Sequence, residues 1–284
     1  SVHGSDGRTV RIRLMNPVIA MIGAGNMAQA LIDGLHARGH PPSRLVAADP
    51  DDDARTRVQR EHAIRCEADN AAAVAGADVV VLAVKPQTID DVAASVADAL
   101  ADRAVVVSVA AGVPVARLAA ALGEGRAIVR VMPNTPALHG AGATGLFAGT
   151  RCSEEQRRAA TELFEAVGKV YRIDDEALMD VVTAVSGSGP AYFFLLAEAL
   201  AEAGAAAGLD RKTAEGLAAQ TAAGAGAMLA GGDESAAELR RRVTSPGGTT
   251  AAALDVLTQR GLAGLVADAV DAAVARGREL GDSG

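Results

Sequence analysis

The pattern of hydrophobic and polar positions changes character once along the chain. Up to about residue 175, short apolar runs rich in Val and Ile alternate with segments whose apolar residues recur every three or four positions. This alternation is typical of a parallel sheet whose strands are joined by crossover helices. From Glu176 onward nearly every segment has a helical period. We therefore expect an α/β domain over residues 15–175 and an all-α domain over residues 176–284.

The apolar runs of the first domain predict its strands, and the segments between them predict its helices. Strands are expected at residues 17–22, 45–48, 77–84, 104–109 and 127–132, with two more at 145–148 and 169–173. Helices are expected at residues 27–38 and 52–61, through residue 98, near residue 118 and from about residue 153. Strands and helices in this order predict a doubly wound, mostly parallel sheet of the Rossmann type.

Turn and cap residues divide the second domain into helices. The helix at 216–230 has apolar or small residues on every side, so it should be surrounded by protein. A domain of roughly a hundred residues has little room to surround a helix by itself, and we expect it to interlock with that of a second subunit. The expected boundary residues are Pro190 in the first turn of one helix, Gly208 at its end, Asp210, Asp233 and Thr249 at the starts of three more, and Gly261 between the last two.

Composition and charge narrow the classes of partner. Of the 284 residues, 50% are hydrophobic but only 2% are aromatic, so the cores should be aliphatic and rich in alanine. The formal net charge of −8, without a basic stripe, argues against binding to nucleic acid. The two cysteines, Cys66 and Cys152, form neither a disulfide framework nor a metal-binding pattern, which favours a reducing cytoplasm and no bound metal. The uncharged stretch 216–232 contains too much Gly, Gln and Thr for a membrane span.

The N-terminus imitates a secretory signal, with Arg8, Arg11 and Arg13 ahead of the apolar run 17–22. A glycine motif begins directly after that run, which favours a first strand instead. We expect residues 1–14 to be a dispensable leader or an added extension, and Met15 to be the natural start.

The glycine motif is Gly23-Ala-Gly25-Asn-Met-Ala28, and it lies between an expected strand and an expected helix. In that context it is a dinucleotide-binding fingerprint, because Gly23 and Gly25 permit a tight turn and let a pyrophosphate approach the helix N-terminus. Ala28 stands where a third glycine often allows close packing of the helix on the strand. A glycine-rich turn in an α/β fold without a ligand is the alternative.

Asp49 ends the second expected strand, roughly twenty residues beyond the fingerprint, where an acidic side chain holds the adenosine ribose of NAD. It would repel the 2′-phosphate of NADP, although Arg55 and Arg57 are close enough in sequence to counter that repulsion. A solvated acidic loop formed by Asp49 and residues 51–53 is at least as good an interpretation. The choice between NADH and NADPH therefore stays open.

Two loops leave expected strands at the edge where open α/β sheets bind ligands. Residues 83–86, Ala-Val-Lys-Pro, place Lys85 within reach of a phosphate or ribose, or leave it as a solvated cation. Residues 132–136, Met-Pro-Asn-Thr-Pro, either present the Asn134 amide and the Thr135 hydroxyl to a nicotinamide or form a plain turn. Another motif, Ser186-Gly-Ser-Gly-Pro-Ala-Tyr192, opens the helical domain as a hinge or packing turn rather than as a substrate contact.

The run Thr244-Ser-Pro-Gly-Gly-Thr-Thr250 precedes an alanine-rich segment with a helical pattern. It presents free backbone N–H groups and hydroxyls at a helix N-terminus, which suits a small anion such as a carboxylate. Taken alone, it is also a plain helix cap. No Ser/His/Asp set and no paired carboxylates stand out in the sequence, so the reaction should need no strong protein acid or base.

These five motifs, in this order and spanning nearly the whole chain from Met15, resemble those of pyrroline-5-carboxylate reductases. The resemblance implies NAD(P)H-dependent reduction of 1-pyrroline-5-carboxylate to L-proline, the last step of proline biosynthesis. It also implies an N-terminal Rossmann domain and a C-terminal helical domain that dimerises by interlacing, with homodimers often assembled into larger rings. In the family, the substrate turn of one subunit faces the cofactor groove of its partner.

The resemblance also implies roles for individual residues. The turn formed by Ser245, Gly247, Gly248 and Thr249 would receive the substrate carboxylate, and Thr250 would bond the ring nitrogen as the catalytic hydroxyl. Asn70 would contact the adenosine side of the cofactor, NADPH or NADH. The full set of expected cofactor contacts is Gly23, Gly25, Asn26, Met27, Ala48, Asp49, Asn70, Ala83, Val84, Lys85, Pro86, Ala110, Gly112 and Asn134.

One departure from the family concerns the cofactor. Family members often have Ser, Asn or Arg after the second strand, whereas this chain has Ala48-Asp49-Pro50. An acidic side chain at this place favours a free ribose 2′-hydroxyl over a 2′-phosphate. We therefore expect measurable use of NADH beside the NADPH that is common in bacterial members.

Two rival functions remain on the same fold. A β-hydroxyacid dehydrogenase would use a Lys on the helix after Pro190, but that helix carries Glu198 and Glu202 and no Lys before Gly208. A non-catalytic NAD(P) sensor would need the glycine fingerprint but would have no reason to keep a carboxylate turn with hydroxyls. The sequence therefore favours the reductase over both.

Overall fold

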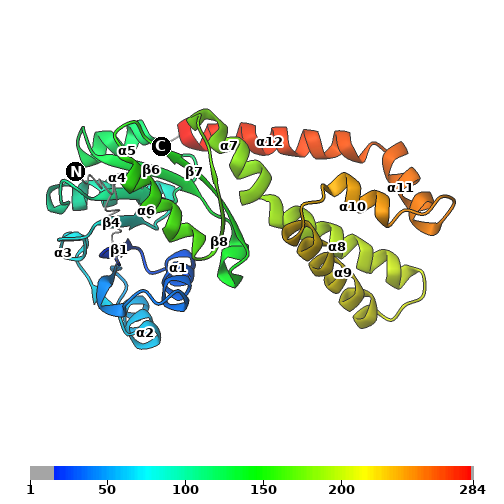
Figure 1. Cartoon of the computed structure of the whole chain (residues 1–284), viewed down its shortest axis with the longest axis horizontal. Coiled ribbons are helices and arrows are strands. Elements are labelled where there is room, and N and C mark those ends of the chain that lie inside the picture. The colour runs from blue at the N-terminus through cyan, green and yellow to red at the C-terminus, as the bar shows by residue number, and fades with distance from the viewer. Residues whose placement is uncertain (1–15, 283–284) are drawn as a thin grey trace, which may run out of the picture.

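The computed structural model describes residues 16–282, so the expected leader at residues 1–14 and the expected start at Met15 lie outside the described residues. The chain forms two parts that differ in architecture (Figure 1). Residues 19–172 build a sheet with helices on both faces, which we call the sheet half. The helices between Glu176 and Asp282 extend away from one side of it and form the helical half.

Within the described residues, the sheet half contains one eight-stranded sheet in the order β3-β2-β1-β4-β5-β6-β7-β8. Neighbouring strands are parallel except β6 and β7, which are antiparallel. The order reverses at β1 and β4, as in a doubly wound Rossmann sheet, which confirms the expected fold class. The strands are β1 (Ile19–Ile22), β2 (Leu45–Ala48), β3 (Arg65–Glu67), β4 (Val79–Leu82), β5 (Val105–Ser108), β6 (Ala127–Met132), β7 (Gly142–Ala148) and β8 (Gly168–Arg172).

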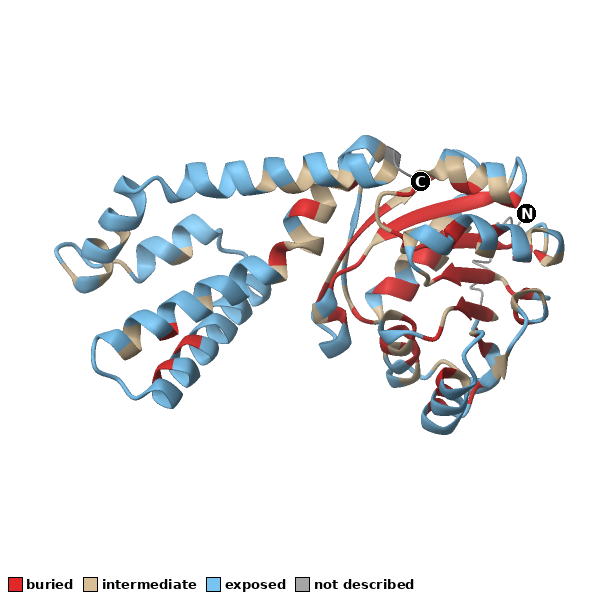
Figure 2. Ribbon diagram, turned by 180° about the vertical axis from the view of Figure 1, so that it is seen from behind, coloured by how far each residue is buried: buried red, intermediate tan, exposed pale blue. Residues whose placement is uncertain are grey.

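Helices cover both faces of this sheet. Every residue of β1, β2, β4 and β5 is buried, as parallel strands covered on both sides require (Figure 2). The sheet half thus completes two aliphatic cores within one chain. One face carries α1 (Asn26–Ala37), α2 (Asp52–His62) and α6 (Glu154–Glu165), and the other carries α3 (Asn70–Val74), α4 (Ile89–Val96) and α5 (Val115–Leu122).

The hydrophobic pattern does not predict β3 or α3. β3 has the sequence Arg-Cys-Glu and lies at the sheet edge, so a polar strand of three residues leaves no apolar run to recognise. Its strand conformation comes from pairing with β2. α3 has only five residues and is capped by Asp69, whose side chain accepts the N–H of Ala71. Elements this short depend on their neighbours rather than on their own periodicity.

The helical half begins with a 3₁₀ turn at Glu176–Leu178 and continues through a π-helical turn at Thr183–Gly187. Asp210 caps α9 as expected, because its side chain accepts the N–H of Thr213. α10 begins after Ser235 rather than after the expected Asp233, because Ser235 and Glu238 form a reciprocal capping box. The helices are α7 (Met179–Val182), α8 (Gly189–Ala206), α9 (Arg211–Gly231), α10 (Ala236–Arg242), α11 (Thr249–Gln259) and α12 (Leu262–Asp282).

The helical half does not complete a core of its own. α8 and α9 pack on each other through a small buried cluster of Ala201, Ala214 and Ala218. Large apolar side chains of α8 face outward, with Phe193 and Phe194 63% and 68% exposed. α9 is likewise exposed along nearly all of its length, so the protein that should surround it is not supplied within one chain (Figure 2).

One helical run of residues 16–282, Glu176–Ala206, is long and apolar enough to cross a membrane by length and composition alone. This differs from the expectation, which considered residues 216–232. Only 17% of the most apolar window of the run is buried in the single chain. An exposed apolar surface of this kind is buried by lipid or by another protein chain, and composition does not choose between them.

Candidate functional site

The candidate cofactor groove begins where β1, β2 and β4 end side by side. Gly23 follows β1 with a φ of +99°, and its N–H donates to the Ala48 carbonyl at 2.8 Å. A Cβ atom on Gly23 would lie 2.5 Å from the carbonyl oxygen of Ala83, which follows β4. Both the backbone conformation and the lack of space therefore require glycine at this position.

The first turn of α1 is open for an anion. Gly25 is its N-cap, and within residues 16–282 no side chain caps this turn. No atom from elsewhere in the described chain lies within 4 Å of the place that a Cβ on Gly25 would take. Asn26 and Met27 supply the first backbone N–H groups of the helix. The first turn of α1, which the structure describes in full, contains no acidic residue. Free donors facing open space at a helix N-terminus are a phosphate-binding arrangement.

Asp49 is tied to the glycine loop instead of lying in a solvated acidic loop. Its Oδ2 accepts the N–H of Ala24 and its Oδ1 accepts the N–H of Asp51, both at 2.9 Å. Arg55 folds over the same segment, with Nη1 donating to the Asp49 carbonyl at 2.8 Å and Nη2 bonding Asp52 at 2.6 Å. A carboxylate and a guanidinium therefore lie side by side at the end of β2. Neither NADH nor NADPH is excluded by this pair.

Residues 83–86 line the same edge after β4. Ala83, Val84 and Pro86 are half-buried, and Lys85 is exposed directly before the 3₁₀ turn Pro86–Thr88. The Lys85 ammonium group is therefore accessible to a ligand in the groove or to solvent. Its contact with the cofactor stays a prediction.

Three other expected contacts differ in availability. Ala48 and Ala110 are 0% and 2% exposed, so they shape the groove by packing and offer little surface. Asn70 opens α3 on the β2 side, and its Nδ2 donates to the Ser95 hydroxyl at 3.0 Å. That bond leaves the Asn70 side-chain oxygen available to a ligand.

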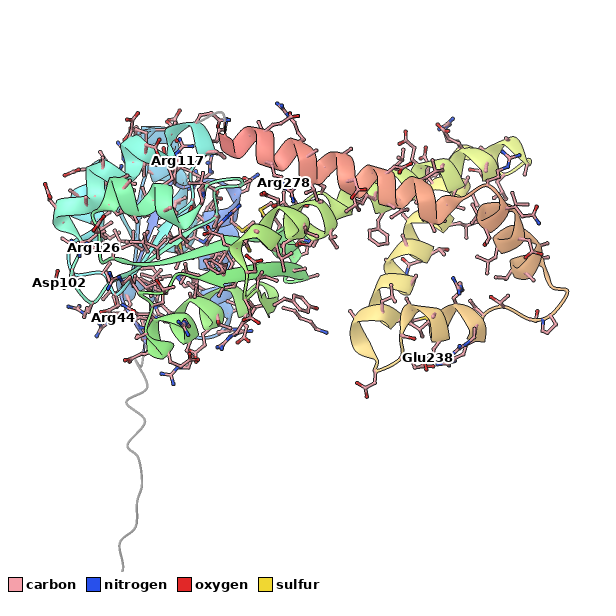
Figure 3. The ribbon with its side chains drawn as sticks, turned by 90° about the horizontal axis from the view of Figure 1, so that it is seen from above. Arg44, Asp102, Arg117, Arg126, Glu238 and Arg278 are labelled. Atoms are coloured by element: carbon pink, nitrogen blue, oxygen red, sulfur yellow. The ribbon has the colours of Figure 1, made fainter. Side chains whose placement is uncertain are left out.

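Gly112, on the loop after β5, lies against the C-terminal end of α12. Its φ is +75°, and a Cβ atom there would lie 3.3 Å from the backbone nitrogen of Gly281. α12 runs from the far end of the helical half back to the sheet half, where it carries Arg278 (Figure 3). The loop expected to line the cofactor groove is therefore covered on one side by the last helix.

Asn134 joins the two halves of the molecule. Its Nδ2 donates to the Ser186 carbonyl at 3.0 Å, and its Oδ1 accepts the N–H of Ala143 at 2.9 Å. The side chain is thus held between β7 and the π-helical turn. This geometry gives Asn134 a structural role that the sequence does not indicate, and its contact with a nicotinamide stays a prediction.

The candidate substrate turn precedes α11 and is uncapped in the same way as α1. Gly247 has a φ of +68°, and the Gly248 N–H closes the turn on the Ser245 carbonyl at 3.1 Å. Gly248 is the N-cap, and no described side chain caps the helix. Thr249 and Thr250 open α11, with Thr250 half-buried. By contrast, α6, α9 and α10 are capped by their own Ser or Asp side chains.

Within one chain the structure does not bring the turn and the groove together. α11 and the turn before it lie at the end of the helical half that is farthest from the sheet (Figure 1). The groove formed by the loops after β1, β4 and β5 lies in the sheet half. An anion held at Thr250 therefore reaches a cofactor at Gly25 only if a second chain supplies one of the two.

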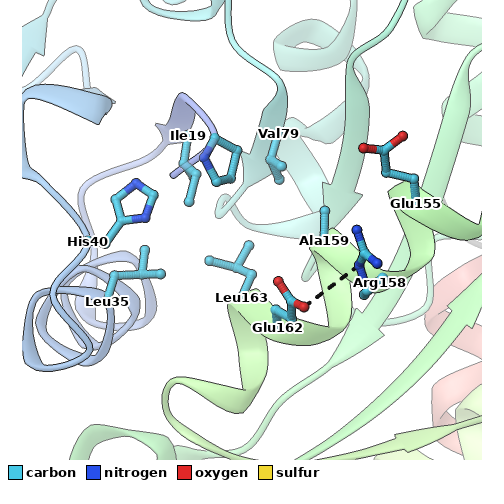
Figure 4. Close-up of a pocket in the computed structure, with 10 residues that line it drawn as sticks. Ile19, Leu35, His40, Val79, Glu155, Arg158, Ala159, Glu162 and Leu163 are labelled. Atoms are coloured by element: carbon cyan, nitrogen blue, oxygen red, sulfur yellow. Dashed lines mark ion pairs between the residues drawn. The ribbon is translucent and has the colours of Figure 1, made fainter. Parts of the chain in front are cut away.

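Other candidate sites carry no chemistry that competes with this one. A cavity of about 90 Å³ lies between α1 and α6 at the amino edge of the sheet, where burial lowers the pKa of His40 (Figure 4). Burial raises the pKa of the Cys66 and Cys152 thiols, so neither is an activated nucleophile. Within residues 16–282 no group of His, Cys, Asp or Glu side chains is arranged to hold a metal ion.

Sequence reasoning missed a charged cluster at the junction of the halves. Arg130 of β6 is 6% exposed, and its guanidinium lies 3.5 Å from carboxylate oxygens of Glu176 and of Asp180. One signal for it exists in the sequence, since Arg130 interrupts the apolar strand Ala127–Met132 and a buried Arg needs acidic partners. The identity of those partners follows only from the fold.

Two family models match the chain. Residues 18–112 match the family described as NADP oxidoreductase, coenzyme F420-dependent. Residues 176–280 match the family described as pyrroline-5-carboxylate reductase dimerisation. The first match covers the glycine loop and the loops after β2, β4 and β5, and the second covers the helical half from its first turn almost to its end.

Similar proteins and structures agree with these matches. A pyrroline-5-carboxylate reductase of Pseudomonas aeruginosa is 50% identical over 269 residues, which cover 95% of this chain and 98% of that protein. A structure of a pyrroline-5-carboxylate reductase from Coxiella burnetii has a TM-score of 0.90 at 41% identity and covers 93% of this chain and 98% of that one. A Plasmodium falciparum pyrroline carboxylate reductase with NADP bound has a TM-score of 0.80 at 28% identity and covers 94% and 98% of the two chains. By its sequence, its fold and both of its halves, the chain belongs to the pyrroline-5-carboxylate reductase family.

Proposed function

We propose that this protein reduces 1-pyrroline-5-carboxylate to L-proline with NADPH or NADH, as the last step of proline biosynthesis. The observation that carries the proposal is the pair of uncapped helix N-termini, one at Gly25 and one at Gly248, on a chain of this family. One suits the diphosphate of a dinucleotide and the other a small carboxylate. A nicotinamide dinucleotide matches the first requirement, and a cyclic imine with a single carboxylate matches the second.

The residues at the groove fit a nicotinamide dinucleotide. The open space beside Gly25 admits a diphosphate to the N–H groups of Asn26 and Met27, and Asp49 lies where the adenosine ribose would be held. When bound, the reduced cofactor supplies the hydride that the imine carbon accepts. The protein's part is to hold the two reactants in line and to keep water away from them.

The substrate turn supplies the rest of the chemistry. The free backbone N–H group of Thr249 and the Ser245 hydroxyl would bind the carboxylate at the positive end of the α11 dipole. The Thr250 hydroxyl would hydrogen-bond the ring nitrogen and help to position its proton. A protonated imine is already electrophilic, so the site needs no Lys or His as a strong acid.

A homodimer would complete each site, with the turn of one chain facing the groove of its partner. The exposed apolar side chains of α8 and α9 and the match of residues 176–280 to a dimerisation family support this arrangement. The same match favours a second protein chain, rather than lipid, as the cover for the apolar run Glu176–Ala206. Assembly of dimers into a larger ring and a cytoplasmic location belong to the same proposal.

The test is loss of absorbance from NADPH and, in a separate assay, from NADH on addition of 1-pyrroline-5-carboxylate. We expect oxidation of both cofactors with proline as the product. Tight cofactor binding without oxidation would contradict the reductase and favour a non-catalytic sensor or another substrate.

The cofactor preference has its own variant. Asp49→Ser removes the charge that opposes a 2′-phosphate and leaves Arg55 in place, so the ratio of kcat/KM for NADPH to that for NADH should rise by about tenfold. Glu67→Gln, a loss of one charge on the neighbouring strand β3, is the matched control and should change the ratio by less than about twofold. An unchanged ratio in the Asp49 variant would remove Asp49 from the ribose site.

A further inference from the structure

α5 has an N-terminus that its own sequence does not cap. Its N-cap is Pro114, which offers no side-chain acceptor, and no neighbouring side chain along that segment caps the helix. The acceptor comes instead from the far side of the domain junction. The Val115 N–H donates to Oε1 of Glu176 at 2.7 Å, across 61 positions of sequence. A carboxylate at this place satisfies a free N–H and lies at the positive end of the helix dipole.

The Glu176 carboxylate is itself held in place. The same Oε1 lies 3.5 Å from Nη1 of the buried Arg130, whose Nη2 lies 3.5 Å from Asp180. Arg130 comes from β6 in the sheet, and Glu176 and Asp180 come from the first two turns of the helical half. The cap on α5 is therefore fixed to the sheet through a guanidinium that has little freedom to move.

The segment that ends at this cap is the loop after β5, residues 109–114. Val113 is 1% exposed, and Gly112 lies against Gly281 near the C-terminal end of α12. A Cβ atom on Gly281 of α12 would lie 2.7 Å from the Gly112 carbonyl oxygen, so the contact is one of backbone with backbone. The first turn and the last turn of the helical half thus hold one loop between them. A cavity of about 400 Å³, lined in part by Pro114, Arg130 and Arg278, lies beside this contact.

We propose that Glu176 is a positioning residue that sets the shape of the cofactor groove by capping α5 from the helical half. The inference rests on the proposed function only in taking residues 110–112 as a wall of that groove. Without the cap, the first turn of α5 would lose its acceptor and the loop after β5 would lose its fixed end. Cofactor affinity should fall as a result, although Glu176 itself belongs to the other half of the chain.

Three variants separate capping from general stability. Glu176→Ala removes both the bond to Val115 and the pairing with Arg130. Glu176→Gln keeps an oxygen that accepts the Val115 N–H and loses only the charge that faces Arg130. Asp180→Asn weakens the other partner of Arg130 and leaves the cap untouched. The full-length protein would be titrated with NADPH, and binding would be measured by the fluorescence of NADPH. The melting temperature and the mass of the dimer would be measured on the same samples.

We expect Glu176→Ala to raise the Kd for NADPH by about tenfold, the loss of one charge-assisted hydrogen bond. Glu176→Gln and Asp180→Asn should each change it by less than about threefold, although both should lower the melting temperature. KM for 1-pyrroline-5-carboxylate should stay within about twofold in all three, because the contacts of the cap, at Val115 and Arg130, include no residue of the substrate turn. The proposal would be overturned if the NADPH Kd rose in proportion to the loss of melting temperature in all three variants, whether or not the variant keeps the hydrogen bond to Val115.

A second pair of variants tests the other side of the loop. Gly281→Ala forces the Gly112 carbonyl away from α12 and should raise the NADPH Kd by about threefold or more. Gly264→Ala places the same methyl group on the same helix, where within the described residues nothing lies within 4 Å, and should leave the Kd unchanged. Equal Kd values for Gly281→Ala, Glu176→Ala and the wild type would show that this loop does not shape the groove. Because the readout is cofactor binding, it stands even if 1-pyrroline-5-carboxylate proves not to be the substrate.

Discussion

The sheet half and the helical half have similar fractions of apolar residues but bury them differently. In the sheet half, all of β1, β2, β4 and β5 is buried between two layers of helices, and two aliphatic cores are complete. In the helical half, α8 and α9 share only a cluster of three alanines, and Phe193 and Phe194 are exposed. The sheet half buries its apolar side chains within one chain, whereas the helical half leaves many of its apolar side chains exposed.

This difference separates what each half requires in order to work. A sheet closed over by its own helices can hold the glycine loop in shape without help, because that loop is fixed by the ends of the neighbouring strands β2 and β4. A pair of helices with outward-facing Phe and Leu side chains needs another surface to exclude water. The candidate substrate turn belongs to the half that is incomplete, so the assembly and the site should be lost together.

The largest effect should come from placing a charge on the exposed face of α8. Phe194→Arg would bury a guanidinium in the dimer interface, and we expect the dimer Kd to rise by at least about a thousandfold, with loss of activity. Light scattering at micromolar concentration measures the mass. Leu138→Arg, a substitution of an exposed apolar side chain in the sheet half, should keep the dimer and is the control. A dimeric, active Phe194 variant would contradict the difference between the halves.

Mixed dimers test whether each site draws on both chains. Thr250→Ala should lower kcat by ten- to a hundredfold, as the loss of one transition-state hydrogen bond does. When Thr250→Ala and Gly25→Ala chains are co-expressed, random pairing should restore about a quarter of the wild-type sites, because half of the dimers contain one site with both elements intact. A site built within one chain would give no recovery, and unchanged kinetics of Thr250→Ala would remove this residue from the site.

Gly25→Ala alone tests the self-sufficiency of the sheet half. The new methyl group meets no atom of the described chain within 4 Å, so the free energy of unfolding should change by less than about 0.5 kcal/mol. The same methyl group would occupy the space intended for the diphosphate, so the Kd for NADPH should rise by at least about tenfold. Gly23→Ala is the contrasting variant, because the Ala83 carbonyl leaves no room for it and stability itself should fall. Equal stability losses in the two variants would contradict this assignment.

The smallest effect concerns pH and lies within the sheet half. Burial between α1 and α6 is the main cause that lowers the pKa of His40, and the charges of His36 and Arg44 add to it. The unfolded chain therefore binds a proton more readily, and stability should fall as the pH drops below about 6.5 towards the folded pKa. Partial exposure keeps this loss of stability small, and His40→Asn should abolish it in thermal melts between about pH 8 and pH 5.5. A pH dependence unchanged in that variant would assign it to other groups.

Much of the sheet half is readable from the sequence because its signals are local. The buried strands are continuous runs such as Val79–Leu82, and the Ser153 cap and the Gly23 turn need only their own neighbours to form. The exceptions are β3 and α3. The conformation of β3 depends on pairing with β2, and that of the short helix α3 depends on its cap, Asp69. The N-cap of α10 is Ser235 rather than the predicted Asp233. Both residue types cap helices, but only Ser235 forms a capping box, with Glu238.

The candidate site divides in the same way. The positions of Gly23, Gly25 and the turn before Thr250 follow from motifs that are contiguous in sequence. The bond from Ala24 to Asp49, the use of the Asn134 amide and the Glu176 cap on Val115 join residues 25 to 61 positions apart. Hydrophobic periodicity and motif spacing do not predict these hydrogen bonds, because each bond forms only when the fold brings the two residues together.

The sequence by itself determined most of the elements, the fold class and the helix N-termini at Gly25 and Gly248, since propensity, capping and glycine geometry act over a few residues. The tertiary structure decided which side chains those elements leave exposed and which distant partners they bind. It alone shows that the groove lies in the sheet half, whereas the turn before α11 lies at the far end of the helical half (Figure 1). That separation is a property of packing between elements, and no local interaction encodes it.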